Sequence, residues 1–140
     1  METAVLGFVG SKNIGDYIQT KAVIDIIDSK KIKILDRENL DKYNEDDIKT
    51  IINGWFMENP KKWPPSNKII PLFISFHINP SAQGELLKKE SLEYLKKHEP
   101  IGCRDHHTRD ILIEKGIKAY YSSCVTTSLQ RSKYLKKNKK

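Results

Sequence analysis

The segment KIIPLFISFHI, residues 68–78, is the longest apolar run in the chain and constrains the fold most strongly. Phe73, Ile74 and Phe76 suit a central strand that is buried on both faces, as strands are in a parallel sheet. Pro71 has no amide hydrogen to donate, so it must lie at the start of that strand. The segment therefore predicts the middle of a sheet with helices on both of its faces.

Strand-like and helix-like segments alternate along the rest of the chain. Further strands are predicted at residues 4–9, 31–36, 49–55, 101–104 and 117–123. Helices are predicted at residues 15–28, 81–99 and 105–116, with a loop or short surface helix at 37–48. This alternation is typical of an α/β domain with a mainly parallel, Rossmann-like sheet. With 140 residues, the chain is expected to form one such domain over residues 1–129.

The basic charge of the chain is concentrated at its end. The formal net charge is +7, and residues 131–140 contribute six lysines and arginines without a balancing acid, which leaves +1 for residues 1–130. A basic stretch of this kind is most often a solvated terminus or part of a linker. Residues 130–140 are therefore interpreted as a basic tail, and a nucleic-acid partner is not expected.

Composition also limits the expected location and cofactors. No apolar run approaches the roughly 20 residues of a transmembrane helix, and the N-terminus lacks the features of a signal peptide, so a cytoplasmic protein is expected. Cys103 and Cys124 lie in no C-x-x-C motif or Cys/His cluster. Reduced thiols are therefore expected, and neither a metal site nor another cofactor is predicted.

The ligand site of such a domain lies beyond the carboxyl ends of its parallel strands, which selects residues 10–16, 53–56, 77–83, 104–108 and 122–127. The glycines of the first loop match neither the G-x-G-x-x-G motif nor the P-loop motif. Asn13 stands three residues before Asp16, the spacing of a helix N-cap and its acidic partner. These two residues are expected to cap the helix. The alternative, which is compatible with the cap, is that the exposed backbone N–H groups at the helix start form an anion site while Asp16 accepts hydrogen bonds from a hydroxylated ligand. Gln19 lies one turn further along the same face.

Other positions at the predicted edge are candidates for chemistry. His77, near the end of the central strand, is the best placed of the four histidines to act as an acid or base, and a structural role is the alternative. Arg104 could bind a carboxylate or phosphate, or could pair with Asp16 or Asp105. Thr108 stands three residues after Asp105, so this pair could cap the next helix.

Two tryptophans follow the third predicted strand. Trp55 and Trp63 could stack on a sugar, or could cover the sheet edge and pack against a neighbouring element, which is the more common use of such side chains. Gly54, at the end of that strand, would allow a ligand or another backbone to approach closely.

Taken in order, five segments of the chain resemble the polysaccharide pyruvyl transferase family. They are NIGDYIQ (13–19), INGW (52–55), PLFISFHI (71–78), IGCRDHHT (101–108) and YYSSCVTTSL (120–129). The asparagine-x-glycine-aspartate loop, the glycine at a strand end and the arginine-aspartate-x-x-threonine motif make this combination specific. One position departs from the family pattern, because Ser123 stands where glycine usually precedes the cysteine.

The resemblance implies a fold and a reaction. Proteins of this family adopt a two-domain, GT-B-type fold like that of nucleotide-sugar glycosyltransferases, with the site in the cleft, and this chain resembles the N-terminal half. The family transfers the enolpyruvyl group of phosphoenolpyruvate to two sugar hydroxyls as a ketal, in surface polysaccharide biosynthesis. A transferase that acts on phosphoenolpyruvate and a glycan or sugar acceptor is therefore expected.

The resemblance also implies roles for residues. Asp16 would orient acceptor hydroxyls, Arg104 would be a cation near the cleft, and Gly15 and Gly54 would keep the loops close to the ligand. A role of His77 as an acid follows from its position alone. The candidate catalytic residues are His77 and Asp16. The candidate substrate-binding residues are Asn13, Gly15, Asp16, Gln19, Gly54, Arg104 and Thr108.

The residues expected to bind phosphoenolpyruvate lie largely in the family's second domain. The chain is therefore expected to be a truncated or partner-dependent half, which works with a second α/β domain or a second copy of itself and has little activity alone. The basic tail would then correspond to the interdomain linker. A non-catalytic anion- or carbohydrate-binding α/β domain is the alternative. A response-regulator receiver domain fits poorly, because the third strand ends in NGW and not in a phosphorylatable aspartate.

Overall fold

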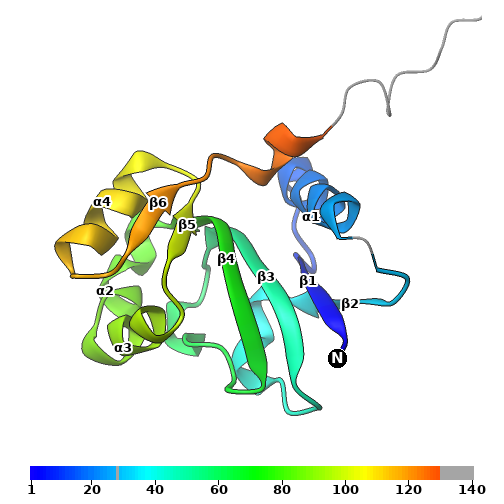
Figure 1. Cartoon of the computed structure of the whole chain (residues 1–140), viewed down its shortest axis with the longest axis horizontal. Coiled ribbons are helices and arrows are strands. Elements are labelled where there is room, and N and C mark those ends of the chain that lie inside the picture. The colour runs from blue at the N-terminus through cyan, green and yellow to red at the C-terminus, as the bar shows by residue number, and fades with distance from the viewer. Residues whose placement is uncertain (28, 130–140) are drawn as a thin grey trace, which may run out of the picture.

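The computed structural model describes residues 1–27 and 29–129, and a parallel sheet lies at their centre (Figure 1). Its six strands are β1 (Thr3–Gly7), β2 (Ile32–Asp36), β3 (Ile48–Phe56), β4 (Ile69–Ile78), β5 (Ile101–Cys103) and β6 (Ala119–Tyr121). Within these described residues the strand order is β2-β1-β3-β4-β5-β6, and every neighbouring pair is parallel. The Rossmann-like α/β fold is confirmed. The predicted basic tail lies outside the described residues.

Helices cover both faces of the sheet. The helices are α1 (Ile14–Ile26), α2 (Gln83–Leu86), α3 (Lys89–Lys97) and α4 (His106–Glu114), and the 3₁₀ helices are η1 (Arg37–Lys42), η2 (Pro60–Lys62), η3 (Pro80–Ala82) and η4 (Val125–Ser128). Ala4 and Leu6 of β1 belong to the larger buried apolar cluster, and Val5 between them belongs to the smaller one with α1. Because successive side chains of a strand point to opposite faces, the two clusters lie on opposite sides of the sheet. Figure 1 shows α1 beside η4 and apart from α2, α3 and α4.

The prediction that the central strand is buried on both faces is only partly right. Phe73 and Phe76 of β4 are buried and Ile74 is half-buried, but Ile70 is 40% exposed and Leu72 is 54% exposed. These two side chains alternate with the buried ones and so point to the face that carries α1. That helix packs against β1 and β3. The first half of β4 therefore has an apolar side chain pattern on a face that is open to solvent.

A β-bulge sets the register at the carboxyl end of the sheet. Ile52 of β3 pairs with Phe73 of β4, and two residues later Gly54 pairs with Phe76, so β4 contains one extra residue between the pairs. The bulge includes Ser75, whose φ angle is +56°. Such a bulge re-aims the side chains that follow it. The pairing beyond it places Trp55 next to His77 at the edge of the sheet.

The single helix predicted at residues 81–99 is wrong, because the structure divides this segment into η3, α2 and α3. In a continuous helix, the carbonyl of Glu85 would accept a hydrogen bond from the amide of Lys89. It accepts one from the hydroxyl of Ser91 instead, at 2.7 Å. The buried Ser91 side chain therefore satisfies the Glu85 carbonyl where the helical ladder is interrupted, and α3 begins as a separate element.

Candidate active site

A cavity of about 570 Å³ opens at the carboxyl ends of β1, β2, β3 and β5. Asn13, Asp16, Gln19 and Arg104, all predicted from the sequence, line it together. Its other lining side chains include Ser11, Lys12, Arg37, Trp55 and Glu58. The volume lies within the range of about 300–1,000 Å³ that is usual for small-molecule sites. The rule that ligands bind beyond the carboxyl ends of parallel strands therefore selected the edge of the sheet at which this cavity opens.

The loop before α1 fixes the position of Asp16 in the cavity wall. Asn13 is the N-cap of α1, and its Oδ1 accepts the Gly15 amide at 2.9 Å. Ser11 Oγ accepts the Asn13 amide at 3.1 Å and donates to the Asp16 carboxylate. The predicted cap is confirmed, with the addition that Ser11 links the two ends of the capping box. The Asp16 carboxylate is thereby held in one orientation beside the cavity.

Gln19 is a buried polar residue whose carbonyl oxygen is not hydrogen-bonded to any described residue. Its side chain is 8% exposed, and Oε1 has no partner among the residues that the structure describes. It lies against Gly54 of β3, where a Cβ atom would come within 2.4 Å of Oε1. Gly54 also has a φ angle of +84°, which favours glycine. A ligand or another backbone was expected to approach Gly54, but the group that lies against it in the structure is a side chain of α1.

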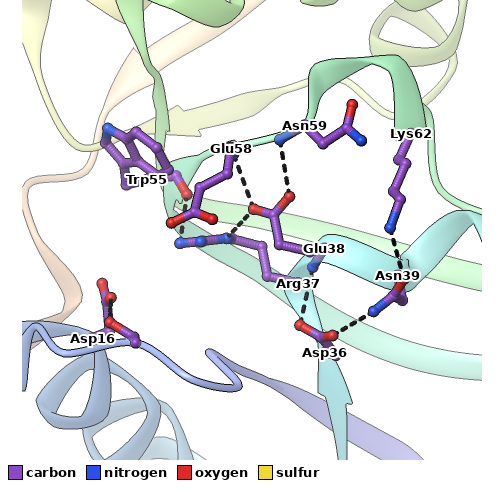
Figure 2. A network of polar contacts seen from close by, with 10 residues as sticks. Asp16, Asp36, Arg37, Glu38, Asn39, Trp55, Glu58, Asn59 and Lys62 are labelled. Atoms are coloured by element: carbon purple, nitrogen blue, oxygen red, sulfur yellow. Dashed lines mark hydrogen bonds and ion pairs between the residues drawn. The ribbon is translucent and has the colours of Figure 1, made fainter.

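Arg37, directly after β2, borders the cavity as a buried cation (Figure 2). It is 4% exposed, its Nε donates to Glu38 at 2.9 Å, and a terminal nitrogen donates to the Trp55 carbonyl at 3.1 Å. The guanidinium also lies 4.7 Å from the ring centre of Phe8 and 5.1 Å from that of Trp55. Contacts from the residue after β1, from η1 and from β3 thus hold Arg37 in place.

Glu38 ties the loop after β2 to the loop after β3. Its carboxylate accepts the amides of Glu58 at 3.0 Å and Asn59 at 3.1 Å, besides the Nε of Arg37. The Glu38 amide in turn donates to Asp36, the N-cap of η1. Figure 2 shows this network and the Asp16 side chain reaching from α1 toward the side where Arg37 and Glu58 lie. The wall opposite α1 is therefore built from two loops that are hydrogen-bonded to each other.

A second group of polar residues, here called the histidine corner, consists of His77, Asp105 and Thr108. His77 Nδ1 lies 2.5 Å from Asp105 Oδ2. Asp105 is the N-cap of α4 and accepts the Thr108 amide at 2.8 Å and the Thr108 hydroxyl at 3.1 Å. Thr108 is fully buried, and its hydroxyl oxygen also accepts the Ile78 amide at 3.3 Å. Thr108 thus faces Asp105 and β4, and it is not among the residues that line the cavity.

The electrostatics of the histidine corner fix the orientation of the imidazole. Burial alone would raise the pKa of Asp105, but the hydrogen bonds from the Thr108 amide and from His77 outweigh it and hold the pKa below its usual value. An ionised carboxylate only accepts hydrogen bonds, so Nδ1 of His77 carries the proton that it donates to Asp105. Nε2 is then left as the nitrogen that can exchange a proton with a ligand.

The histidine corner lies next to the cavity along the edge of the sheet. His77 pairs with Trp55 across β3 and β4, and the pairing of Phe76 with Cys103 places Arg104 beside His77. Arg104 and Trp55 line the cavity, whereas His77 does not. Arg104 forms no ion pair within the described part of the chain, so neither alternative pairing considered for it is present.

Sequence reasoning missed Arg37 and Glu58, and it selected the loop that contains Ser11 without naming this residue. Arg37 directly follows a predicted strand, so the rule that selected the other loops would also have selected this one. The two tryptophans have different roles: Trp63 packs in the core against Phe56 and Phe76, and Trp55 borders the cavity.

The position at which the chain departs from the family pattern has a backbone conformation that is unusual for serine. Ser123 has a φ angle of +57°, a conformation that favours glycine. The neighbouring Ser122 side chain accepts the Ser75 amide at 2.9 Å, which joins this turn to the bulge in β4.

In residues 1–27 and 29–129, no three His, Cys, Asp or Glu side chains gather as metal ligands would, and no helix is long and apolar enough to cross a membrane.

Comparison with known proteins identifies the family. The family model described as polysaccharide pyruvyl transferase matches residues 13–140, from the N-cap Asn13 onward. No curated protein and no solved structure matches the chain. The family match includes most residues of the cavity wall and the whole histidine corner. The chain therefore belongs to the polysaccharide pyruvyl transferase family.

Proposed function

We propose that the chain provides the acceptor side of a transferase that moves the enolpyruvyl group of phosphoenolpyruvate onto two hydroxyls of a sugar as a ketal. The observation that carries the proposal is the cavity shared by Asp16, Gln19 and Trp55. Carboxylate and amide groups hydrogen-bond to sugar hydroxyls, and an aromatic face packs on the apolar side of a sugar ring. Membership of the family supports the transferase class.

The reaction moves protons as well as the three-carbon group. The methylene carbon of phosphoenolpyruvate takes up a proton and becomes a methyl group, one sugar hydroxyl adds to the adjacent carbon, and a second hydroxyl replaces the phosphate. Of the two hydroxyl protons, one balances the new methyl group and the other leaves with the phosphate. General acid and base groups, and cations that hold the oxyanions, accelerate such steps.

The candidate residues fit these roles. Asp16 binds and orients the acceptor hydroxyls, with Asn13 fixing the start of α1 and Gly15 keeping the loop close. Arg104 supplies a cation at the cavity. His77 lies next to the cavity without lining it, so the proposal requires the reacting end of the ligand to extend to the histidine corner. There, Nε2 exchanges the proton, because Asp105 holds Nδ1. In this proposal His77 and Asp16 are the catalytic residues.

Thr108 and Gly54 have indirect roles in the proposal. Thr108 is fully buried and bonded to Asp105, so it is a positioning residue that acts through Asp105 on His77. Gly54 permits Gln19 to lie against β3. Both residues therefore shape the site without contacting the sugar.

We further propose that catalysis requires a second wall for the cavity. The resemblance assigns the binding of phosphoenolpyruvate largely to the second domain of the family. A second α/β domain or a second copy of this chain would supply that wall, and the described domain alone would bind the acceptor with little turnover.

Binding and turnover of the purified chain test the proposal. Calorimetry should detect binding of a methyl galactoside or methyl mannoside, and Asp16→Ala should weaken it about tenfold or more, since a hydrogen bond to a charged group is lost. Asp110→Ala is the matched control, because Asp110 is an exposed aspartate outside the cavity. Phosphate release from phosphoenolpyruvate should be near background for the chain alone.

Three outcomes would change the proposal. Rapid phosphate release by the chain alone would show that no second wall is needed. Binding of neither glycoside would remove the acceptor assignment. Sugar binding without ketal formation, even when a second α/β domain is supplied, would favour a non-catalytic carbohydrate-binding domain.

A further inference from the structure

Arg37 has features that the proposed acceptor role does not use. Among the described residues, Arg37 is the only charged residue that is buried, and it borders the cavity. Burying a charge is unfavourable unless its hydrogen-bonding groups are satisfied. A buried arginine at a cavity wall therefore requires an explanation.

The contacts of Arg37 leave part of its guanidinium available. Two of its N–H groups donate, one to Glu38 and one to the Trp55 carbonyl. The other three have no partner among the residues that the structure describes. The rings of Phe8 and Trp55 pack against the guanidinium and restrict its rotation toward other hydrogen-bond acceptors. Arg37 is therefore a fixed cation with unused donors beside a cavity.

The Glu38 carboxylate neutralises the charge of Arg37 only in part. Its carboxylate also accepts the backbone amides of Glu58 and Asn59, so its negative charge is shared among three donors. Arg104 and Lys12 border the same cavity, while Asp16 and Glu58 are its acidic residues. The cavity thus combines groups that suit sugar hydroxyls with groups that suit an oxyanion.

We propose that Arg37 anchors an oxyanion, a phosphate or carboxylate group, of a ligand bound in this cavity. The planar guanidinium binds such groups through two parallel hydrogen bonds, which a fixed orientation favours. Phosphoenolpyruvate or an acceptor that is a sugar phosphate would supply this chemistry. The inference rests on the proposed function and adds an anionic subsite to it.

Calorimetry with three probes tests the inference. The probes are phosphoenolpyruvate, a hexose 1-phosphate and the corresponding methyl hexoside, which has no anionic group. At least one anionic probe should bind, and Arg37→Gln should weaken that binding about tenfold to a hundredfold, because a charged pair is lost. Binding of the methyl hexoside should change less than twofold.

Arg109→Gln is the matched control. Arg109 also donates through Nε to the acid that follows it in sequence, at 2.8 Å to Asp110, but it lies outside the cavity. This variant should leave the binding of all three probes unchanged. Arg37→Lys provides a second test should the glutamine variant fail to fold, and it should also lose most of the anionic binding, because an ammonium group lacks the planar fork.

The outcomes separate the possible explanations. Loss confined to phosphoenolpyruvate would place the donor at Arg37, and loss confined to the hexose phosphate would place the acceptor there. Equal loss of the methyl hexoside would show that Arg37 only holds the loops together and would overturn the inference, as would unchanged binding in Arg37→Lys or no binding of either anion. If the methyl hexoside binds and the anions ignore Arg37, the proposed acceptor site stands and the inference fails alone.

Discussion

The cavity wall and the histidine corner lie side by side, but they differ in whether their buried polar groups are hydrogen-bonded. In the histidine corner, Asp105 and Thr108 are hydrogen-bonded to each other and to β4. In the cavity wall, Gln19 Oε1 is buried without a partner in the described part of the chain. A satisfied network fixes the orientation of a group, whereas an unsatisfied buried group lowers stability until a ligand pairs with it. The histidine corner is thus fixed by its own hydrogen bonds, whereas the cavity wall contains a buried amide oxygen that no described residue satisfies.

Gly54→Ala should have the largest effect on stability, because it disturbs the packing of Gln19 against β3. The new Cβ would meet Gln19 Oε1 at 2.4 Å, at a φ angle of +84°. Strain and overpacking together should lower the free energy of unfolding by about 3 kcal/mol, measured by urea denaturation.

Gly10→Ala separates the two contributions in that prediction. Gly10 has a similar φ angle of +74°, but a Cβ there meets nothing within 4 Å. Its cost should therefore be only the backbone strain, about 1 kcal/mol. Equal losses for the two variants would contradict the role assigned to the contact between Gly54 and Gln19.

Asp105→Ala should have the next largest effect, about 2 kcal/mol, because it removes both a helix cap and the partner of His77. Asn13→Ala removes the corresponding cap of α1, a hydrogen bond of 2.9 Å from the Gly15 amide to Asn13 Oδ1 in the exposed loop beside the cavity. This substitution should lower the free energy of unfolding by about 1 kcal/mol or less. Urea denaturation of both variants measures the difference. If Asn13→Ala costs as much as Asp105→Ala, the corner is no more tightly coupled than the loop.

Substitution of one buried polar residue in each region should have effects of opposite sign. Thr108→Val deletes a hydroxyl that bonds to Asp105 and to the Ile78 amide, and should cost about 1–2 kcal/mol. Gln19→Met removes an unsatisfied group with little change in shape, and should leave stability unchanged or raise it by up to about 1 kcal/mol.

Ligand binding completes that comparison. Gln19→Met should weaken the binding of a methyl hexoside while the free energy of unfolding stays level or rises, both measured on the same preparation. A variant that is destabilised as much as Thr108→Val would show that Gln19 already has a partner in the unliganded protein.

The parts of the site that depend on local spacing were predictable from the sequence. Asn13 with Asp16, and Asp105 with Thr108, follow the spacing of capped helix starts, and both caps form. The carboxyl-end rule also placed Arg104 and His77 at one edge of the sheet. The roles of these residues in binding and catalysis stay predictions.

The parts that depend on contacts between distant segments were not predictable. Arg37 is buried because Phe8, directly after β1, and Trp55 of β3 pack on its guanidinium. The bulge at Ser75 sets the pairing of Trp55 with His77. It cannot be predicted from the sequence, because an apolar run has no periodicity that a single extra residue would disturb. Such features arise from packing across the sheet and not from the local pattern of residues.

The pH dependence of stability should show the smallest effect, since the Asp105 side chain is partly exposed. Because its pKa is lower in the folded protein than the ordinary value of 3.8, the carboxylate stabilises the fold fully above that value, and this contribution is lost as the pH falls through the folded pKa. Wild type should therefore be more stable than Asp105→Asn at pH 6, and the gap should narrow toward pH 3. His77→Gln, which removes one of the interactions that lower this pKa, should show a weaker dependence than wild type. Urea denaturation across this pH range measures all three proteins, and a gap that stays constant would mean that the Asp105 charge does not hold the histidine corner together.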